Sequence, residues 1–240
     1  MPMTDDWATV LDELIEEMLG QAHWRHPPVD AVALAKERLH MQVCLDASLA
    51  NRGRAQKGRH GSFIYLRPDD YQERYQWTVA HEIGEHWRGR ILAELGVSAE
   101  ELLPQSLEEL ANRFAARLLV PTRWLAQVAK ETQWDLIALK QQFSTASHEV
   151  IAWRTLDMPV PCIISVIDQG KLTQRRSNSW PAPRTLTPLE TKCQRIVHER
   201  SEPFALHDEG WQVQGWPIHQ NSWKREILRS TWEAAEWSLG

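Results

Sequence analysis

The sequence is poor in cysteine and lacks both a long apolar run and a basic start. Its 240 residues include three cysteines, Cys44, Cys162 and Cys193, whose wide spacing fits neither a disulfide framework nor a cysteine-rich zinc site. No apolar stretch approaches the roughly 20 residues that span a bilayer. Residues 4–20 hold six carboxylates and no Lys or Arg, the opposite of a signal peptide. We therefore expect a cytoplasmic protein.

A strong excess of either charge is also missing. The net charge is −5, and 42% hydrophobic and 25% charged residues are ordinary for a globular protein. A mildly acidic chain argues against extensive nucleic-acid binding, because phosphate contacts need clustered Lys and Arg. Residues 171–200 carry seven Lys and Arg against two Glu, which a solvated surface explains more simply than a nucleic-acid contact. The 13 tryptophans are most simply explained by packing.

Apolar spacing and helix breakers predict a first part rich in helices. Helices are expected over residues 5–19, 29–39, 72–95, 106–119, 122–131, 135–143 and 148–156, with strands at 41–45 and 62–66. Residues 51–61 are basic and rich in glycine, which predicts a mobile hairpin loop. Pro159 and Pro161 mark a boundary, so we predict one domain over residues 1–158 and another over residues 159–240.

The second domain combines predicted strands with one helix. Strands are expected at residues 162–168, 171–176, 211–216 and 223–229, and a helix at 189–200. The predicted fold class is therefore α+β: a mainly helical domain with a small sheet, followed by a small α+β C-terminal domain.

The segment with the strongest chemical signal is His81-Glu82-Ile83-Gly84-Glu85-His86. In the common H-E-x-x-H motif, two histidines four residues apart hold a zinc ion on one helical face, and the intervening glutamate activates a water. In this chain the residue four positions after His81 is Glu85, and the second histidine follows one position later, at His86. The pattern leaves open a substituted ligand, a shifted site and the remains of a site.

Helical geometry favours Glu85 over His86 as the partner of His81. At about 100° per residue, His81 and Glu85 lie about 40° apart on one flank of the apolar stripe, whereas His86 lies about 140° from His81. Glu82 projects to the side, toward the position of a reacting water. Gly84 costs up to about 1 kcal/mol relative to alanine inside a helix. Its presence suggests that another backbone or a substrate passes close by.

The helix expected over residues 106–119 offers a third ligand. Glu108 falls at the edge of its apolar stripe, whereas Glu109 faces nearly the opposite way. A carboxylate at the margin of a buried face needs a partner, since burying it alone is costly. That partner is either a metal ion or, as the structural alternative, an arginine or a helix end.

Two stretches together resemble the ImmA/IrrE family of metallo-endopeptidases. They are Trp77-Thr78-Val79-Ala80-His81-Glu82-Ile83-Gly84 and Leu107-Glu108-x-x-Ala111-Asn112-Arg113-Phe114-Ala115-Ala116-x-Leu118-Leu119-Val120-Pro121. The run Ser147–Leu156 and the strand-turn-strand pattern over 162–178 also agree, so the resemblance covers roughly residues 25–178. It implies a zincin-like fold for the domain over residues 1–158 and zinc-dependent proteolysis.

Matched residue by residue, the resemblance also implies a site. Glu82 corresponds to the general base, and the metal ligands are His81, Glu85 and Glu108, with His86 as the less favoured alternative to Glu85. The family has histidine where this chain has Glu85. One imidazole and two carboxylates make a harder, more anionic site, so we expect Zn²⁺, with Mn²⁺ or Fe²⁺ competing better than usual.

The expected activity is cleavage of a specific protein substrate; known family members cleave transcriptional repressors. Strand 62–66, just before the motif, is a candidate edge for pairing with an extended substrate. Two alternatives stay open. One is a degenerate relative that binds protein or metal without cleaving, and the other is a DNA-binding regulator that uses residues 122–156, whose scattered charge disfavours it. We expect no membrane partner and no nucleic-acid partner.

Overall fold

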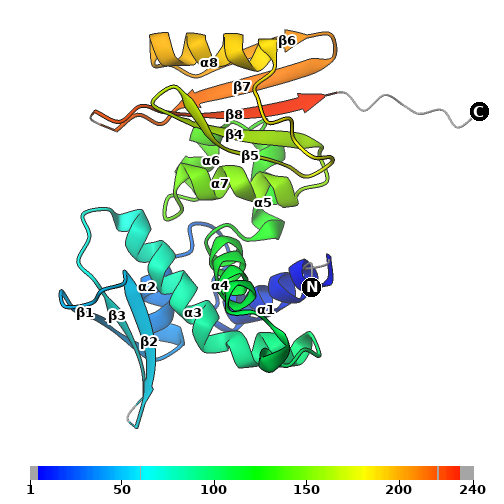
Figure 1. Cartoon of the computed structure of the whole chain (residues 1–240). Helices are drawn as coiled ribbons and strands as arrows, with labels where there is room; N and C mark the ends of the chain where they lie inside the picture. The colour runs from blue at the N-terminus through cyan, green and yellow to red at the C-terminus, as the bar shows by residue number, and fades with distance from the viewer. Residues whose placement is uncertain (1–4, 60, 221, 233–240) are drawn as a thin grey trace, which may run out of the picture. The chain divides into compact units, whose positions relative to one another are not determined.

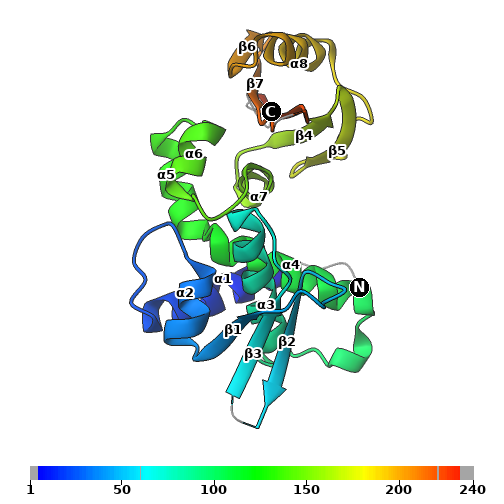
Figure 2. The same ribbon diagram turned by 90° about the vertical axis from the view of Figure 1, so that its left-hand side faces the viewer.

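The computed structural model describes residues 5–59, 61–220 and 222–232, and the chain divides into two compact units (Figures 1 and 2). One unit comprises Met1–Val128 with Lys140–Ser147, and the other comprises Ala129–Leu139 with His148–Gly240. The predicted α+β fold class is confirmed. The domain boundary after residue 158 stays a prediction. In the described part of the chain, no helix is long and apolar enough to cross a membrane.

The first unit is organised around one long helix, α3 (Gln72–Glu94). Its other helices are α1 (Asp5–Gln21), α2 (Ala31–Ala33) with a π-helical turn at Leu34–Arg38, α4 (Pro104–Leu119) and most of α5 (Thr122–Glu131). A short 3-10 turn spans Ala99–Glu101. Its strands are β1 (Met41–Leu45), β2 (Gly53–Gly58) and β3 (Gly61–Leu66). Helix α3 lies between this sheet on one side and α4 on the other (Figures 1 and 2).

The small sheet corrects two expectations from the sequence. Residues 51–61 were expected to form a loop, but Gly53–Gly58 is a strand that pairs antiparallel with β3. The order β1-β3-β2 makes β3 the central strand, so the expectation that residues 62–66 form an edge is wrong. Strand β2 has an edge that no described strand pairs with, and it lies against α3 because Gly53 has no side chain. A Cβ there would lie 2.3 Å from Cγ2 of Thr78.

Helices α3 and α4 approach closely at Gly84. A Cβ on Gly84 would lie 3.0 Å from Cδ1 and 3.2 Å from Cβ of Phe114, whose side chain is fully buried. The close neighbour of this glycine is therefore helix α4, through the side chain of Phe114, so no substrate is needed to explain the glycine. Ala80 on α3 and Ala111 and Ala115 on α4 are buried as well, so small residues recur where these helices face the core.

The second unit is a five-stranded antiparallel sheet with helices on both faces. Its strands, in the order β5-β4-β8-β7-β6, are β4 (Cys162–Asp168), β5 (Lys171–Ser177), β6 (Phe204–Asp208), β7 (Trp211–Pro217) and β8 (Arg225–Trp232). Helix α8 (Pro188–Arg200) covers one face and α7 (His148–Arg154) the other (Figure 1). Most of α6 (Leu136–Gln142) and a 3-10 turn at Thr155–Asp157 complete it. Strand β6 was missed in the sequence.

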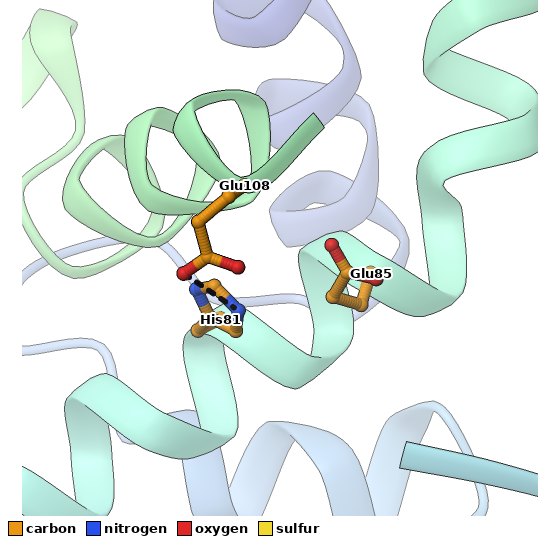
Figure 3. Close-up of side chains that lie close together, drawn as sticks. All are labelled: His81, Glu85 and Glu108. Carbon is orange, nitrogen blue, oxygen red and sulfur yellow. Dashed lines mark ion pairs between the residues drawn. The ribbon is translucent and has the colours of Figure 1, made fainter. Parts of the chain in front are cut away.

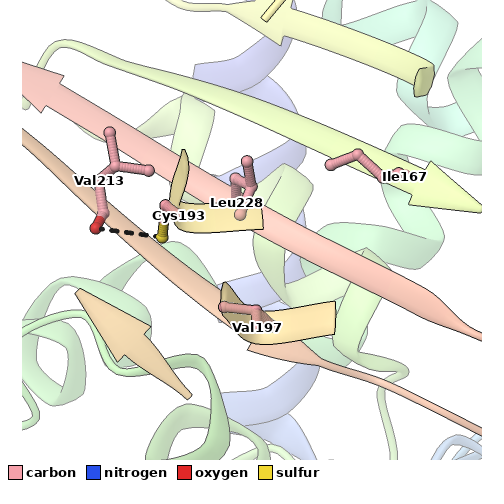
Figure 4. Close-up of a cluster of buried hydrophobic side chains, with 5 residues drawn as sticks. All are labelled: Ile167, Cys193, Val197, Val213 and Leu228. Atoms are coloured by element: carbon pink, nitrogen blue, oxygen red, sulfur yellow. Dashed lines mark hydrogen bonds between the residues drawn. The ribbon is translucent and has the colours of Figure 1, made fainter. Parts of the chain in front are cut away.

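The core of the second unit lies between α8 and the sheet. Figure 4 shows Cys193 and Val197 of α8 against Ile167, Val213 and Leu228 of the strands. Burial, with a smaller contribution from the Glu190 carboxylate, raises the pKa of the Cys193 thiol to about 11. The thiol therefore stays protonated and donates to the backbone carbonyl of Val213, at 3.8 Å.

A buried ion pair fixes the start of α8 on the sheet. Arg175 Nη2 lies 2.9 Å from Glu190 Oε2, and both side chains are at most 5% exposed. Glu190 also accepts hydrogen bonds from the Ser230 hydroxyl and from the backbone N–H of Thr187, with which it forms a capping box. Burial alone would raise the pKa of the Glu190 carboxyl, but these donors together hold it below its ordinary value.

The contact at Gly84 predicts opposite effects for two glycines of one helix. Gly84→Ala should lower the free energy of unfolding by about 1 kcal/mol, because overpacking against Phe114 costs more than the helix propensity gained. Gly89→Ala should raise it by up to about 1 kcal/mol, because nothing lies within 4 Å of a Cβ at Gly89. Urea denaturation measures both variants. Equal stabilisation by both would contradict close packing at Gly84.

The buried pair predicts a pH-dependent stability difference. Glu190→Gln should cost about 3 kcal/mol at neutral pH, because it leaves Arg175 buried without its counter-ion. A carboxyl with a lowered folded pKa stabilises the fold above its ordinary pKa of 4.5 and loses that contribution as the pH falls below it. Unfolding free energies measured between about pH 7 and pH 3 should therefore converge for wild type and variant. A constant difference would argue against the ion pair.

Candidate metal centre

Two helices of the first unit bring three potential metal ligands together. His81 and Glu85 lie one turn apart on α3, and Glu108 points toward them from α4 (Figure 3). Each offers one ligand atom, and the three atoms lie within 4.8 Å of one another. Among the described residues, this is the group of His, Cys, Asp and Glu side chains with the spacing of a metal site. The residues proposed as ligands from the sequence therefore share one place in the fold.

The His81 ring has a polar neighbour at each nitrogen. Nδ1 lies 3.1 Å from Oδ1 of Asn112, and Nε2 lies 3.8 Å from Oε1 of Glu108. Because an amide oxygen only accepts hydrogen bonds, this contact assigns a ring proton to Nδ1 and turns Nε2 toward the carboxylates. A second contact, 3.5 Å from Nδ2 of Asn112 to Oε1 of Glu108, joins two of the three candidate ligands through one amide.

Asn112 is a site residue that helical spacing alone could have indicated. It follows Glu108 by four residues, which places both side chains on one face of α4. What the sequence could not supply is its contact with His81, because that contact depends on how α4 packs against α3.

Glu82 occupies a buried position between α3 and β2. The residue is 7% exposed, and Oε2 accepts a hydrogen bond of 2.5 Å from the backbone N–H of Ala55 in β2. Burial raises the pKa of the Glu82 carboxyl, and the nearby carboxylate of Glu108 acts in the same direction. The Ala55 N–H and the charge of His81 oppose this shift without cancelling it. Glu82 is therefore a stronger proton acceptor than an exposed glutamate.

The structure leaves two neighbouring residues outside the group. His86 is exposed, and partial burial of its ring, together with the charge of Lys57, lowers its pKa. Glu109 pairs with Arg113, one turn along α4, at 2.6 Å. Neither belongs to the three-residue group, which has the composition that helical geometry favoured.

The donor set fits a divalent metal ion. One imidazole nitrogen and two carboxylate oxygens are ligand types found in catalytic zinc sites, which combine three protein ligands with an open position. The same oxygen-rich set also suits Mn²⁺ or Fe²⁺. His81, Glu85 and Glu108 would hold such an ion.

Comparisons with known proteins agree with this arrangement. The model of the M78 peptidase family, described as the IrrE N-terminal-like domain, matches residues 36–154, which include the candidate ligands and Glu82. Comparison with curated proteins gives no match. Among solved structures, a Mycobacterium tuberculosis transcriptional regulator aligns with 92% of this chain and 75% of its own, with a TM-score of 0.68 and 14% identity. At that identity the likeness concerns the fold alone.

The Asn112 contacts predict a measurable effect on metal affinity. Asn112→Ala should weaken metal binding by about 10-fold or more, because the His81 ring loses the acceptor that orients it. Asn112→Asp keeps an acceptor toward Nδ1 and should retain more of the affinity. Competition with a chromophoric chelator measures both. An unchanged affinity in Asn112→Ala would show that the amide does not orient the ligand.

Proposed function

Because residues 36–154 of this chain belong to the IrrE N-terminal-like domain family, we propose that the protein is a metal-dependent endopeptidase that cleaves a specific protein substrate. The observation that carries the proposal is the convergence of His81, Glu85 and Glu108 beside the buried Glu82. When bound by these three side chains, a divalent ion supplies Lewis acidity, which polarises a carbonyl and lowers the pKa of water.

Glu82 is the residue that moves the proton. Its raised pKa suits a general base, because the carboxylate takes a proton from a water molecule more readily than an exposed glutamate does. The protonated carboxyl then returns that proton to the leaving amine. The hydrogen bond from Ala55 N–H fixes one oxygen, Oε2, while the carboxylate stays beside His81.

Strand β2 is the proposed binding edge for the substrate. Its free edge carries the N–H of Ala55, which already points at Glu82, so this edge leads directly to the catalytic carboxylate. An extended peptide that adds to the sheet there would pair through the backbone groups of this edge other than the Ala55 N–H, which Glu82 occupies. This role replaces the one expected for residues 62–66, which lie at the centre of the sheet.

The proposed partner is a protein substrate, and a transcriptional repressor is the class that the family resemblance suggests. The competing possibility is a degenerate relative that binds protein or metal without cleaving. Glu85 in the place of a histidine is the observation that favours it. A peptidase would cut its substrate and generate new N-termini in a reaction that needs Glu82. A degenerate relative would generate none.

Metal content and proteolysis of matched variants test the proposal. Purified wild-type protein should contain about one divalent ion per chain, which His81→Ala and Glu108→Gln should lose. Glu109→Gln removes the neighbouring charge of the same helix and should retain the ion. With a peptide library as probe, mass spectrometry should detect new N-termini for wild type. Glu82→Gln should keep the metal but reduce the cleavage rate about 10²–10⁴-fold.

Two results would contradict the proposal in different ways. Absence of metal from wild type, with binding restored by Glu85→His, would indicate a degenerate site. Metal binding with the same low cleavage for wild type and Glu82→Gln would leave a metal-binding protein without peptidase activity.

A further inference from the structure

One candidate ligand already has a cationic partner on its own helix. Arg88, one turn beyond Glu85 on α3, forms an ion pair through Nη2 with Oε2 of Glu85. Nε of Arg88 is buried and has no hydrogen-bond partner among the described residues. The carboxylate of Glu85 is therefore the anion that holds this guanidinium at the site.

The electrostatic effect of Arg88 on the site depends on whether a metal is bound. Without a metal, Glu85 and Glu108 carry two negative charges near each other, and Arg88 reduces their repulsion. A divalent ion neutralises both carboxylates by itself. The guanidinium beside Glu85 would then add a surplus positive charge next to the ion, and like charges repel.

Arg88 is exposed enough to move away from Glu85. The Arg88 side chain is 36% exposed, whereas that of Glu85 is 21% exposed. The guanidinium can therefore move toward water when Glu85 turns to a metal. Because Glu85 is largely shielded from solvent, replacing Arg88 by a metal ion should change the binding free energy more than it would at a fully solvated carboxylate.

We infer that Arg88 competes with the metal ion for Glu85 and thereby sets the metal affinity of this site. The inference rests on the proposed function, since it concerns the same ligands. The alternative role, in which Arg88 only orients Glu85 as a ligand, predicts the opposite sign, because loss of an orienting contact weakens binding.

The sign of the change in metal affinity tests this inference. In chelator competition with Zn²⁺ and Mn²⁺, Arg88→Gln should bind about 10-fold more tightly than wild type, because the competing charge is gone. The metal-free variant should also melt at a lower temperature and gain more on metal addition, since Arg88 stabilises the metal-free state. Unchanged or weaker binding by Arg88→Gln would overturn the inference.

Arg90 provides the matched control. It lies two residues further along α3 and pairs with Glu17 of α1, outside the ligand group. Arg90→Gln removes the same charge from the same helix and should change the affinity by less than about twofold, if only direct competition for Glu85 matters. An equal effect of both variants would mean that general helix charge, and not Arg88, governs binding.

A double-mutant cycle with Glu85→His separates competition from long-range repulsion. In the Glu85→His background Arg88 has no carboxylate to occupy, so Arg88→Gln should change the affinity by less than about threefold. The same gain in both backgrounds would refute competition for Glu85. Metal-binding wild type with an unaffected Arg88→Gln would overturn this inference alone, whereas absence of metal from every variant would overturn the proposed function too.

Discussion

The close packing of α3 against α4 is the constraint on which the candidate site depends. Because position 84 is a glycine, the ring and Cβ of Phe114 fit against α3. The two helices therefore approach closely enough for side chains of α4 to reach side chains of α3. Only because α4 lies this near does Glu108 approach His81, and only then does Asn112 meet the Nδ1 side of the same ring. The arrangement of the candidate ligands thus depends on the packing at Gly84. A larger residue at position 84 would disturb both the helix packing and the ligand arrangement.

The sheet determines the opposite side of the site. Strand β2 lies against α3 where Gly53 replaces a side chain with space, and its Ala55 N–H then fixes Glu82. Two glycines in different elements therefore serve related purposes: one admits α4 and the other admits β2. Between them, α3 carries a buried carboxylate toward the strand and a pair of candidate ligands toward the helix. This division separates the buried carboxylate from the candidate metal ligands while keeping both on one helix.

What could be predicted from the sequence was what local periodicity determines. The spacing of His81 and Glu85, the marginal position of Glu108 and the outward direction of His86 follow from a helix of 3.6 residues per turn, and the structure agrees with each direction. Contacts between distant segments could not be predicted in this way. Strand β2 lacks the β-branched and aromatic residues that usually indicate a strand. It forms because it pairs with β3 and fits beside α3. The role of Arg88 could not be predicted from the sequence either. Its ion pair with Glu85 is an ordinary i,i+3 contact until the structure shows Glu85 beside Glu108.

The path of the chain limits how its two units could have been combined. The chain passes from one unit to the other after Val128, Leu139 and Ser147, so neither unit is one continuous segment. The inserted piece, Ala129–Leu139, belongs with the later strands: the Trp134 ring lies over the Arg229 guanidinium, and Asp135 accepts from the Trp216 indole. A fragment ending near residue 158 would keep this piece and lose the strands it packs on. Removing the C-terminal sheet at a single junction would therefore leave Trp134 and Asp135 without their partners on strands β7 and β8.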